Sequence, residues 1–114
     1  MLESSLRTSE AARRIGVHPS RIRQRLSSHP PDLYGIRNGS EWLLPAFQFT
    51  RNGLVPDIDK VIARLEADHD SVTVLQWFTS PNLDLIDHDE MVSPLTWLRA
   101  GLPWKPVAEL AEDL

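Results

Sequence analysis

The chain has 114 residues, 41% of them apolar and 25% charged, so it is long enough for one domain or two small units and too apolar to be disordered. It contains no cysteine, which excludes a disulfide framework, a thiolate metal site and thiol catalysis. No apolar run approaches about 18 residues and no apolar leader opens the chain, so we expect a cytoplasmic protein with no part in a membrane.

The formal net charge of −4 conceals an asymmetry between the two halves of the chain. Residues 1–55 contain eight Lys or Arg and four Asp or Glu, whereas residues 56–114 contain four and twelve. A basic half suits a polyanionic partner, and an acidic half suits a different partner. The alternative is that two solvated surfaces differ by chance, but the change of charge coincides with a turn signal at residues 51–57.

Residues 8–27 have the pattern of two short helices joined by a tight turn. Thr8 is a suitable N-cap, and Gly16 can adopt the left-handed conformation that ends the first helix. Pro19 suits the first position of the second helix. A small residue before Gly16 and Ile22 after it give the spacing of a helix-turn-helix, whose second helix enters the major groove of DNA. An ordinary helical hairpin with a solvated basic face is the alternative.

Polar residues on the second helix are the predicted DNA-reading side chains. Arginine can bind guanine and glutamine can bind adenine through two hydrogen bonds, and further arginines can bind phosphates. We expect Arg23 and Gln24 to contact bases and the other arginines of the set to contact phosphates. The predicted DNA-binding residues are Ser20, Arg21, Arg23, Gln24, Arg25 and Arg37.

A short hairpin is predicted directly after these helices, in the stretch LYGIRNGSEWLLP. Apolar and polar residues alternate on both sides of the Asn-Gly pair at 38–39, which favours a type I′ turn between strands at 33–37 and 40–44. This hairpin would be the wing of a winged helix-turn-helix. Arg37 would then lie beside its tip, and Trp42 would pack it onto the helices.

The region from about residue 6 to residue 49 resembles MerR-like and excisionase-like winged helix-turn-helix domains, on the residues TSEAARRIGVHPSRI and SEWLLP. The resemblance implies that residues 1–52 form a DNA-binding domain whose partner is double-stranded operator DNA. The turn or linker signal RNGLVPD follows this region and favours a domain boundary there. Residues 53–114 would then form a second domain.

Four helices are predicted in the second domain, at residues 56–67, 70–78, 94–101 and 106–114. Apolar residues recur at i, i+3, i+4 and i+7 in the first and last of them, and Val72 is expected to face inward in the second. The predicted fold class is therefore mainly α. It consists of a winged helix-turn-helix with a short β-hairpin, followed by a small C-terminal helical bundle.

The stretch VLQWFTSPNLDLIDHDEMVSPLTWLRAGLPWKPVAELAEDL resembles the C-terminal domain of Xre/MbcA/ParS-type antitoxins. The family pattern combines a tryptophan helix, a Pro-Asn loop, a Pro-x-x-Trp-Leu helix, a glycine and a terminal helix rich in Val, Leu and Ala. The matching positions are Trp77, Ser80, Pro81, Asn82, Pro94, Trp97, Leu98, Gly101, Val107 and Ala111. The usual N-terminal domain of that family is wingless, so its operator geometry does not carry over to this chain.

This resemblance implies a type II antitoxin that neutralises a co-encoded toxin, commonly a RES-domain protein that degrades NAD, and that represses its own operon. In the family the C-terminal region commonly contacts the toxin and obstructs its active site. The predicted toxin-binding residues are Trp104, Lys105, Glu109, Glu112, Asp113 and Leu114. The alternatives are a stand-alone DNA-binding regulator, an excisionase-like protein and a protein-interaction module with an incidental basic face.

A homodimer is expected, because a single motif covers one DNA half-site and specific operator binding generally uses two. Residues 58–65 and 107–114 carry more apolar stripe than a small domain would bury alone, which favours dimer contacts in the helical half. In the alternative, the terminal apolar residues close the core of the protein itself.

Two runs of acids and histidine, residues 68–70 and residues 87–90, have the composition of metal-ligand clusters. Adjacent residues on a helix point in different directions, and no second histidine follows at three or four positions, so a polar loop or helix cap is favoured. No Gly-rich phosphate loop, Ser-His-Asp arrangement or pair of buried carboxylates stands out. We therefore expect no enzyme activity, no cofactor and no metal site.

Overall fold

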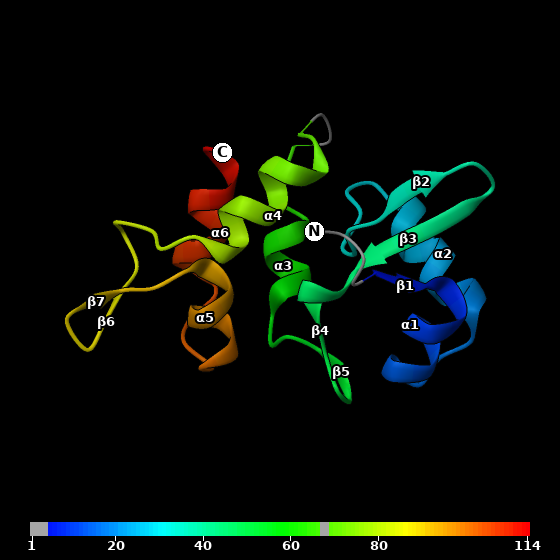
Figure 1. Cartoon of the computed structure of the whole chain (residues 1–114), viewed down its shortest axis with the longest axis horizontal. Coiled ribbons are helices and arrows are strands. Elements are labelled where there is room, and N and C mark those ends of the chain that lie inside the picture. The colour runs from blue at the N-terminus through cyan, green and yellow to red at the C-terminus, as the bar shows by residue number, and fades with distance from the viewer. Residues whose placement is uncertain (1–4, 67–68) are drawn as a thin grey trace. The chain divides into compact units, whose positions relative to one another are not determined.

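The structure is a computed structural model that describes residues 5–66 and 69–114 (Figure 1). The chain divides into two compact units, Met1–Leu54 and Val55–Leu114. The boundary expected from the sequence lies slightly earlier, after residue 52. None of the helices among the described residues combines the length and the apolar character needed to cross a membrane.

The predicted fold class is wrong. Helices make up 44% of the described residues and strands 18%, so the fold is mixed α/β and not a winged helix-turn-helix followed by a helical bundle. The strands form three small antiparallel sheets. Segments 5–7, 49–54 and 86–91, expected outside any strand, account for the difference. The backbone N–H and C=O groups of these segments form hydrogen bonds with a neighbouring strand, so they do not need a helix to be paired.

A three-stranded antiparallel sheet in the order β1-β3-β2 organises the first unit. Its strands are β1 (Ser5–Arg7), β2 (Ile36–Asn38) and β3 (Glu41–Pro45). The predicted hairpin is therefore present as β2 and β3, but β1 pairs with the other edge of β3. An isolated two-stranded hairpin is marginally stable in water, and the third strand supplies the missing partner.

The β2–β3 turn lies one position later than the sequence predicts. Asn38 is paired with Glu41, so the two turn residues are Gly39 and Ser40. Gly39 has a φ of 64°, and Ser40 does not share this left-handed conformation. Glycine at the first turn position alone is the pattern of a type II′ turn, whereas the expected type I′ turn needs a positive φ at both positions.

Helix α1 (Thr8–Ile15) follows β1 directly. Its N-cap is Arg7 and not Thr8, and the Glu10 carboxylate accepts a hydrogen bond from the Arg7 backbone N–H at 3.1 Å. Gly16 ends the helix with a φ of 84° and donates its N–H to the carbonyl of Ala12. The glycine expected to end this helix therefore does so.

Helix α2 (Pro19–Ser27) begins at the proline, as the sequence predicts, and packs against α1. His18 is its N-cap, and His18 Nδ1 accepts a hydrogen bond from the backbone N–H of Ser20 at 3.1 Å. Beyond its C-terminal end, the Asp32 carboxylate accepts a hydrogen bond from Arg25 Nε at 2.8 Å. This ion pair fastens the last turn of α2 to the loop that leads to β2.

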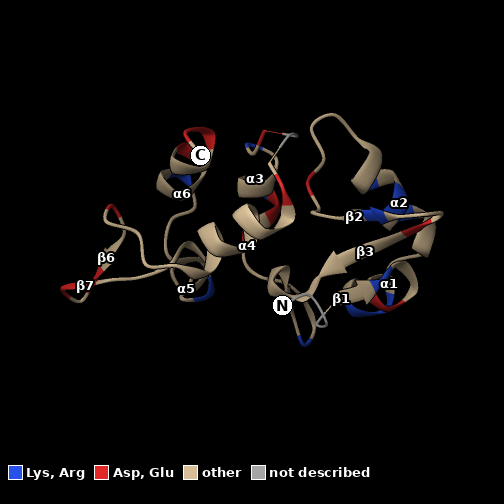
Figure 2. Ribbon diagram, turned by 45° about the horizontal axis from the view of Figure 1, so that its top comes forward, with Lys and Arg blue, Asp and Glu red and all other residues tan. Residues whose placement is uncertain are grey.

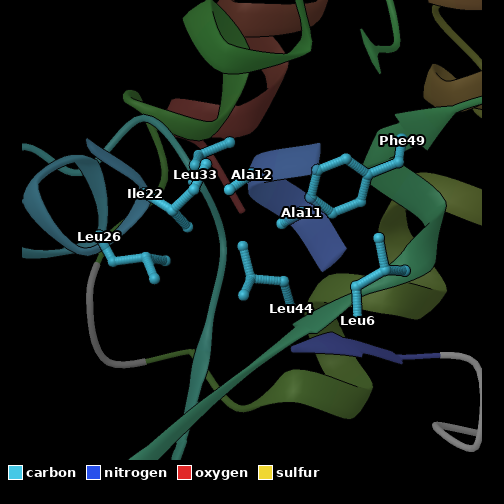
Figure 3. Close-up of a cluster of buried hydrophobic side chains, with 8 residues drawn as sticks. All are labelled: Leu6, Ala11, Ala12, Ile22, Leu26, Leu33, Leu44 and Phe49. Carbon is cyan, nitrogen blue, oxygen red and sulfur yellow. The ribbon is translucent and has the colours of Figure 1, made fainter. Parts of the chain in front are cut away.

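Apolar side chains from β1, α1, α2, β3, the loop before β2 and strand β4 (Phe49–Thr50) converge in the core of the first unit (Figure 3). The buried cluster consists of Leu6, Ala11, Ala12, Ile22, Leu26, Leu33, Leu44 and Phe49. Ala11 and Ala12 are 0% and 2% exposed, and their small side chains allow α1 to approach its neighbours closely. The core thus holds α1 and α2 against the sheet.

Gln48 is a fully buried polar residue in the first unit. It ends the 3-10 helix η1 (Ala46–Gln48). Its amide Nε2 donates to the carbonyls of Tyr34 at 2.7 Å and Pro45 at 3.1 Å, and its Oε1 accepts from the Tyr34 N–H at 2.9 Å. The side chain therefore satisfies backbone groups in the loop before β2 and at the end of β3.

The segment expected as a linker contains a second hairpin. Strands β4 (Phe49–Thr50) and β5 (Gly53–Leu54) pair antiparallel, with Thr50 opposite Gly53. The turn between them consists of Arg51 and Asn52, both of which are exposed. Helix α1 also contacts β5, so this hairpin belongs to the first unit.

The described residues of the second unit form four short helices and one hairpin. These are α3 (Ile58–Ile62), α4 (Ser71–Thr79), β6 (Ile86–Asp87), β7 (Glu90–Met91), α5 (Pro94–Arg99) and α6 (Lys105–Glu112). Helix α3 packs against α6, and α4 packs against α5. The predicted helix 56–67 is shorter than expected, and its last residue, Ala67, lies outside the described residues.

The inward face of α4 includes Phe78, as expected, but not Val72. Val74 and Phe78 are buried, whereas Val72 is 59% exposed. Residues 74 and 78 are four apart and share a helix face, which residue 72 does not. The polar run at 87–90 forms the β6–β7 turn, in which His88 and Asp89 have φ values of 52° and 66°.

Candidate nucleic-acid interface

The predicted base-reading residues lie exposed on α2. Ile22 and Leu26 are buried at 0% and 6% exposure and anchor the inner side of the helix. Helical periodicity therefore turns Arg21, Arg23 and Gln24 toward solvent, and all three are exposed. Within the described part of the chain, no side-chain hydrogen bond or ion pair occupies these three residues. Their donors are available to a ligand.

Two other residues of the predicted set are engaged within the first unit. The Ser20 hydroxyl lies 2.9 Å from His18 Nδ1, in the first turn of α2. Arg25 is partly buried and forms the ion pair with Asp32 described above. Both interactions position α2. Contacts of Ser20 and Arg25 with DNA stay predictions.

Arg37 is held beside the tip of the β2–β3 hairpin. Its guanidinium carbon lies 5.0 Å from the ring centroid of Trp42, and its Nε donates to the Gly39 carbonyl at 3.2 Å. Trp42 is half-buried and packs against the hydrophobic core cluster. A cation over an aromatic face is attracted by the ring and has fewer positions to explore. The hairpin therefore presents this arginine in a defined place.

Helix α2 and the hairpin border the same depression, which has a volume of about 360 Å³. Its lining residues are Arg7, Thr8, Ser9, Pro19, Arg23, Ser40, Glu41 and Trp42. Two of these lining residues, Arg7 and Glu41, form an ion pair, with Arg7 Nη1 2.9 Å from Glu41 Oε1. Arg23 is therefore brought close to the hairpin, as a joint reading surface requires.

The Arg7–Glu41 pair was not identified from the sequence. The two residues are far apart along the chain and meet because β1 pairs with β3, where Arg7 lies opposite Leu43. The sequence shows their opposite charges, but it does not predict the N-terminal strand that brings the two residues together. A strand of three residues carries too little alternation to be recognised.

Most arginines of the first unit lack a carboxylate partner. Among the described acids of this unit, Glu10 accepts from a backbone N–H, Asp32 pairs with Arg25, and Glu41 pairs with Arg7. No ion pair among the described residues neutralises the other arginines, which are Arg13, Arg14, Arg21, Arg23, Arg37 and Arg51. Figure 2 shows Lys and Arg gathered on α1, α2 and β2. This excess of unpaired positive charge is the electrostatic pattern of a polyanion-binding surface.

The chain is similar in fold to the protein Rv2175c. An NMR structure of Rv2175c has a TM-score of 0.64 to this chain at 19% sequence identity, and the match covers 96% of this chain and 79% of that one. At this identity the likeness concerns the fold alone. A scan against protein-family models and a search of curated proteins give no match.

The predicted toxin-binding residues lie in or next to α6, a helix that contributes to the core of the second unit. Val107, Ala108 and Ala111 of α6 are 0–1% exposed. The Trp104 ring lies 5.2 Å from Lys60 Nζ and 6.0 Å from the Arg64 guanidinium carbon.

The acidic side chains of α6 differ in whether they form ion pairs, and Glu112 is the one that does so among the described residues. Arg64 also forms an ion pair with Glu112 at 2.7 Å. Lys105, Glu109 and Asp113 are exposed, and Leu114 is half-buried. Binding of this set to a toxin stays a prediction.

The apolar stripes from which a dimer was expected are largely used inside the second unit. Ile58, Val61 and Ile62 are 0–3% exposed, so they offer little surface to a second copy. Exposed apolar side chains occur instead at Leu83, Ile86 and Met91, on and before the β6–β7 hairpin. The homodimer stays a prediction without support from these stripes.

The acid and histidine run at 68–70 includes a helix cap. Asp70 is the N-cap of α4, and its Oδ1 accepts from the Thr73 N–H at 2.8 Å. This hydrogen bond is the largest cause that lowers the pKa of Asp70 below its ordinary value of 3.8. Asp68 lies outside the described residues. Among the residues that the structure describes, no group of three or more His, Cys, Asp or Glu could hold a metal ion.

Proposed function

We propose that the protein binds double-stranded DNA through its first unit and regulates transcription in the cytoplasm. The observation that carries this proposal is that Arg21, Arg23 and Gln24 of α2 are exposed and unpaired, and that Arg23 lies beside the hairpin that holds Arg37. Their inner neighbours are buried, so the helix presents them on a rigid support. Guanidinium and amide groups can form paired hydrogen bonds with base edges in the major groove.

In this proposal α2 lies in the major groove and the hairpin tip lies against the adjacent backbone. Arg23 borders the depression shared with the hairpin and is the first candidate for a base contact, with Gln24 as the second. Arg37 and Arg21 supply phosphate contacts that set the register of the helix. Arg25 helps to position α2, because its ion pair with Asp32 holds the C-terminal end of this helix.

Binding to the promoter of its own gene, measured by fluorescence anisotropy, tests this proposal. Arg23→Ala should weaken specific binding by about 1–3 kcal/mol and relax the sequence preference, because a base contact is lost. Arg99→Ala removes an exposed arginine from α5 of the second unit and is the matched control, expected to bind as the unchanged protein does. Unchanged affinity and preference in Arg23→Ala would contradict the assignment of Arg23.

Neutralisation of a toxin is a second candidate function, favoured by the acidic charge exposed on α6. Glu109 and Asp113 are exposed, and no ion pair among the described residues engages them. Such a surface suits a basic site on a partner protein. Co-expression with the product of the adjacent gene, followed by growth measurement, tests it. Rescue that survives Glu109→Lys with Asp113→Lys would remove these acids from the mechanism.

A further inference from the structure

A second group of arginines lies in the first unit, apart from the residues of α2 and the β2–β3 hairpin. Arg13 and Arg14 come from the second half of α1, and Arg51 comes from the β4–β5 turn. Together with Glu10 they line a depression of about 280 Å³ that has no residue of α2, β2 or β3 in its lining. This group is called the α1–β4 cluster below.

Local structure explains why these three arginines meet. Residues 10, 13 and 14 are spaced i, i+3 and i+4, so they share one face of α1, while Ala11 and Ala12 occupy the buried face. Arg14 Nη1 donates a hydrogen bond to the Thr50 carbonyl at 3.3 Å and ties α1 to β4. The two-residue β4–β5 turn then brings Arg51 to the same depression.

The three positive charges of the α1–β4 cluster are not neutralised by the described acidic residues of the protein. Glu10 is the one acid in its lining, and one of its oxygens already accepts the Arg7 N–H at the start of α1. Within the described residues, no ion pair reaches Arg13, Arg14 or Arg51. Three like charges around one depression repel each other, and an anion placed between them would relieve that repulsion.

Guanidinium groups favour a particular kind of anion. Arginine presents its N–H donors in a planar fork that matches the oxygens of phosphate, and paired contacts of this kind are stronger than neutral hydrogen bonds. The three side chains are exposed, so a ligand can approach from outside. A shallow, exposed site of this kind suits a phosphate that is part of a larger backbone, held in place by further contacts.

We propose that Arg13, Arg14 and Arg51 form a phosphate-binding site for the backbone of duplex DNA, in addition to the α2 and hairpin surface. This inference rests on the proposed function. The cluster contributes affinity and no base recognition, since a phosphate carries no sequence information. It also extends the DNA contact of the first unit to the β4–β5 turn.

Salt dependence of DNA binding by the full chain tests this proposal. Binding to a long mixed-sequence duplex is measured by fluorescence anisotropy over a range of salt concentrations. Each phosphate contact contributes about 0.9 to the slope of log K against log salt, so Arg13→Gln and Arg51→Gln should each flatten the slope by about that amount. Preference for the protein's own promoter should stay unchanged in both variants. Arg99→Gln in the second unit is the control and should leave the slope unchanged.

Each possible result has a defined meaning. If the unchanged protein binds DNA and both variants keep its slope, the α1–β4 cluster is not a DNA contact and this inference alone is overturned. If the unchanged protein does not bind duplex DNA, the proposed function fails and the inference fails with it. A titration with inorganic phosphate, followed by NMR, identifies the other source of phosphate. Shifts at Arg13 and Arg51 combined with an unchanged DNA slope would assign the site to a free anion and overturn the inference.

Discussion

At the scale of single residues, the first unit depends on polar side chains whose partners are backbone groups. Gln48 shows this most clearly, because it is fully buried and forms three hydrogen bonds with the backbone of Tyr34 and Pro45. Glu10 is similar, since its carboxylate accepts a hydrogen bond from the Arg7 backbone N–H at the start of α1. The contact between Gln48 and Tyr34 is not visible from residue type alone, because the two residues are 14 positions apart along the chain.

Replacement of Gln48 by alanine should destabilise the first unit strongly. The change removes the hydrogen bond to the buried Pro45 carbonyl and two hydrogen bonds to the Tyr34 backbone, and a buried polar group that loses its partner costs about 1–3 kcal/mol. The free energy of unfolding, measured by urea denaturation, should fall accordingly. Gln76→Ala is the control, because that glutamine is exposed on α4 and surface changes usually stay within about 0.5 kcal/mol. Equal effects of the two substitutions would contradict the structural role of Gln48.

At the scale of elements, the helices were more predictable than the strands. The end of α1 and the start of α2 follow from Gly16 and Pro19, whose backbone requirements are local and can be read from the sequence, whereas the N-cap of α1 is Arg7 and not the predicted Thr8. Strands β4 to β7 have two residues each, so no alternation exists from which to recognise them. Their formation depends on a partner strand, which is information about the folded chain.

The candidate site also contains residues whose positions could be predicted from the sequence and residues whose positions could not. Exposure of Arg21, Arg23 and Gln24 follows from helical periodicity once Ile22 and Leu26 are placed inside. The engagement of Arg25 depends on the path of the loop that returns Asp32 to the helix, which no periodicity describes. The α1–β4 cluster likewise needs the unexpected hairpin that brings Arg51 to α1.

The turn of the β6–β7 hairpin carries a local strain that substitution should relieve. His88 and Asp89 both have a positive φ, the pattern of a type I′ turn, for which Asn-Gly is the favoured pair. We expect the double change His88→Asn and Asp89→Gly to stabilise the second unit by about 1 kcal/mol, because left-handed backbone costs about that much for an ordinary residue. Thermal unfolding measures this gain.

A glycine placed elsewhere in the same hairpin separates strain relief from a general effect of glycine. Glu90 lies in β7, where glycine weakens a strand, so Glu90→Gly should lower the unfolding temperature. A decrease in both variants would show that the turn at 88 and 89 is not strained.

At the scale of the whole molecule, charge and core are both divided between the two units. The first unit contains eight arginines and a core of its own, and the second contains most of the acids and buries α3 against α6. The alternative in which the terminal apolar residues close the protein's own core has direct support, since Val107 and Ala111 are buried. The terminal helix is therefore a structural part of the second unit, whatever else its exposed acids do.

Deletion of residues 104–114 should consequently unfold the second unit and leave the first one folded. The deletion uncovers Ile58 and Val61 on α3, and a unit this small has little stability to lose. Circular dichroism should show partial loss of helix, while DNA binding by the first unit stays measurable. Glu109→Lys with Asp113→Lys is the control, because both side chains are exposed and the fold should survive. A truncated chain with full helical content would show that α6 is dispensable for folding.

The ion pair between Arg7 and Glu41 has a consequence for how the protein responds to its surroundings. Both side chains are at least half exposed, so dissolved ions weaken their attraction as the ionic strength rises. This pair links the start of α1 to the first residue of β3 at the hairpin tip. In the proposed DNA complex, salt would therefore act twice: it would compete with the arginines for phosphates, and it would weaken the ion pair that links the start of α1 to the hairpin.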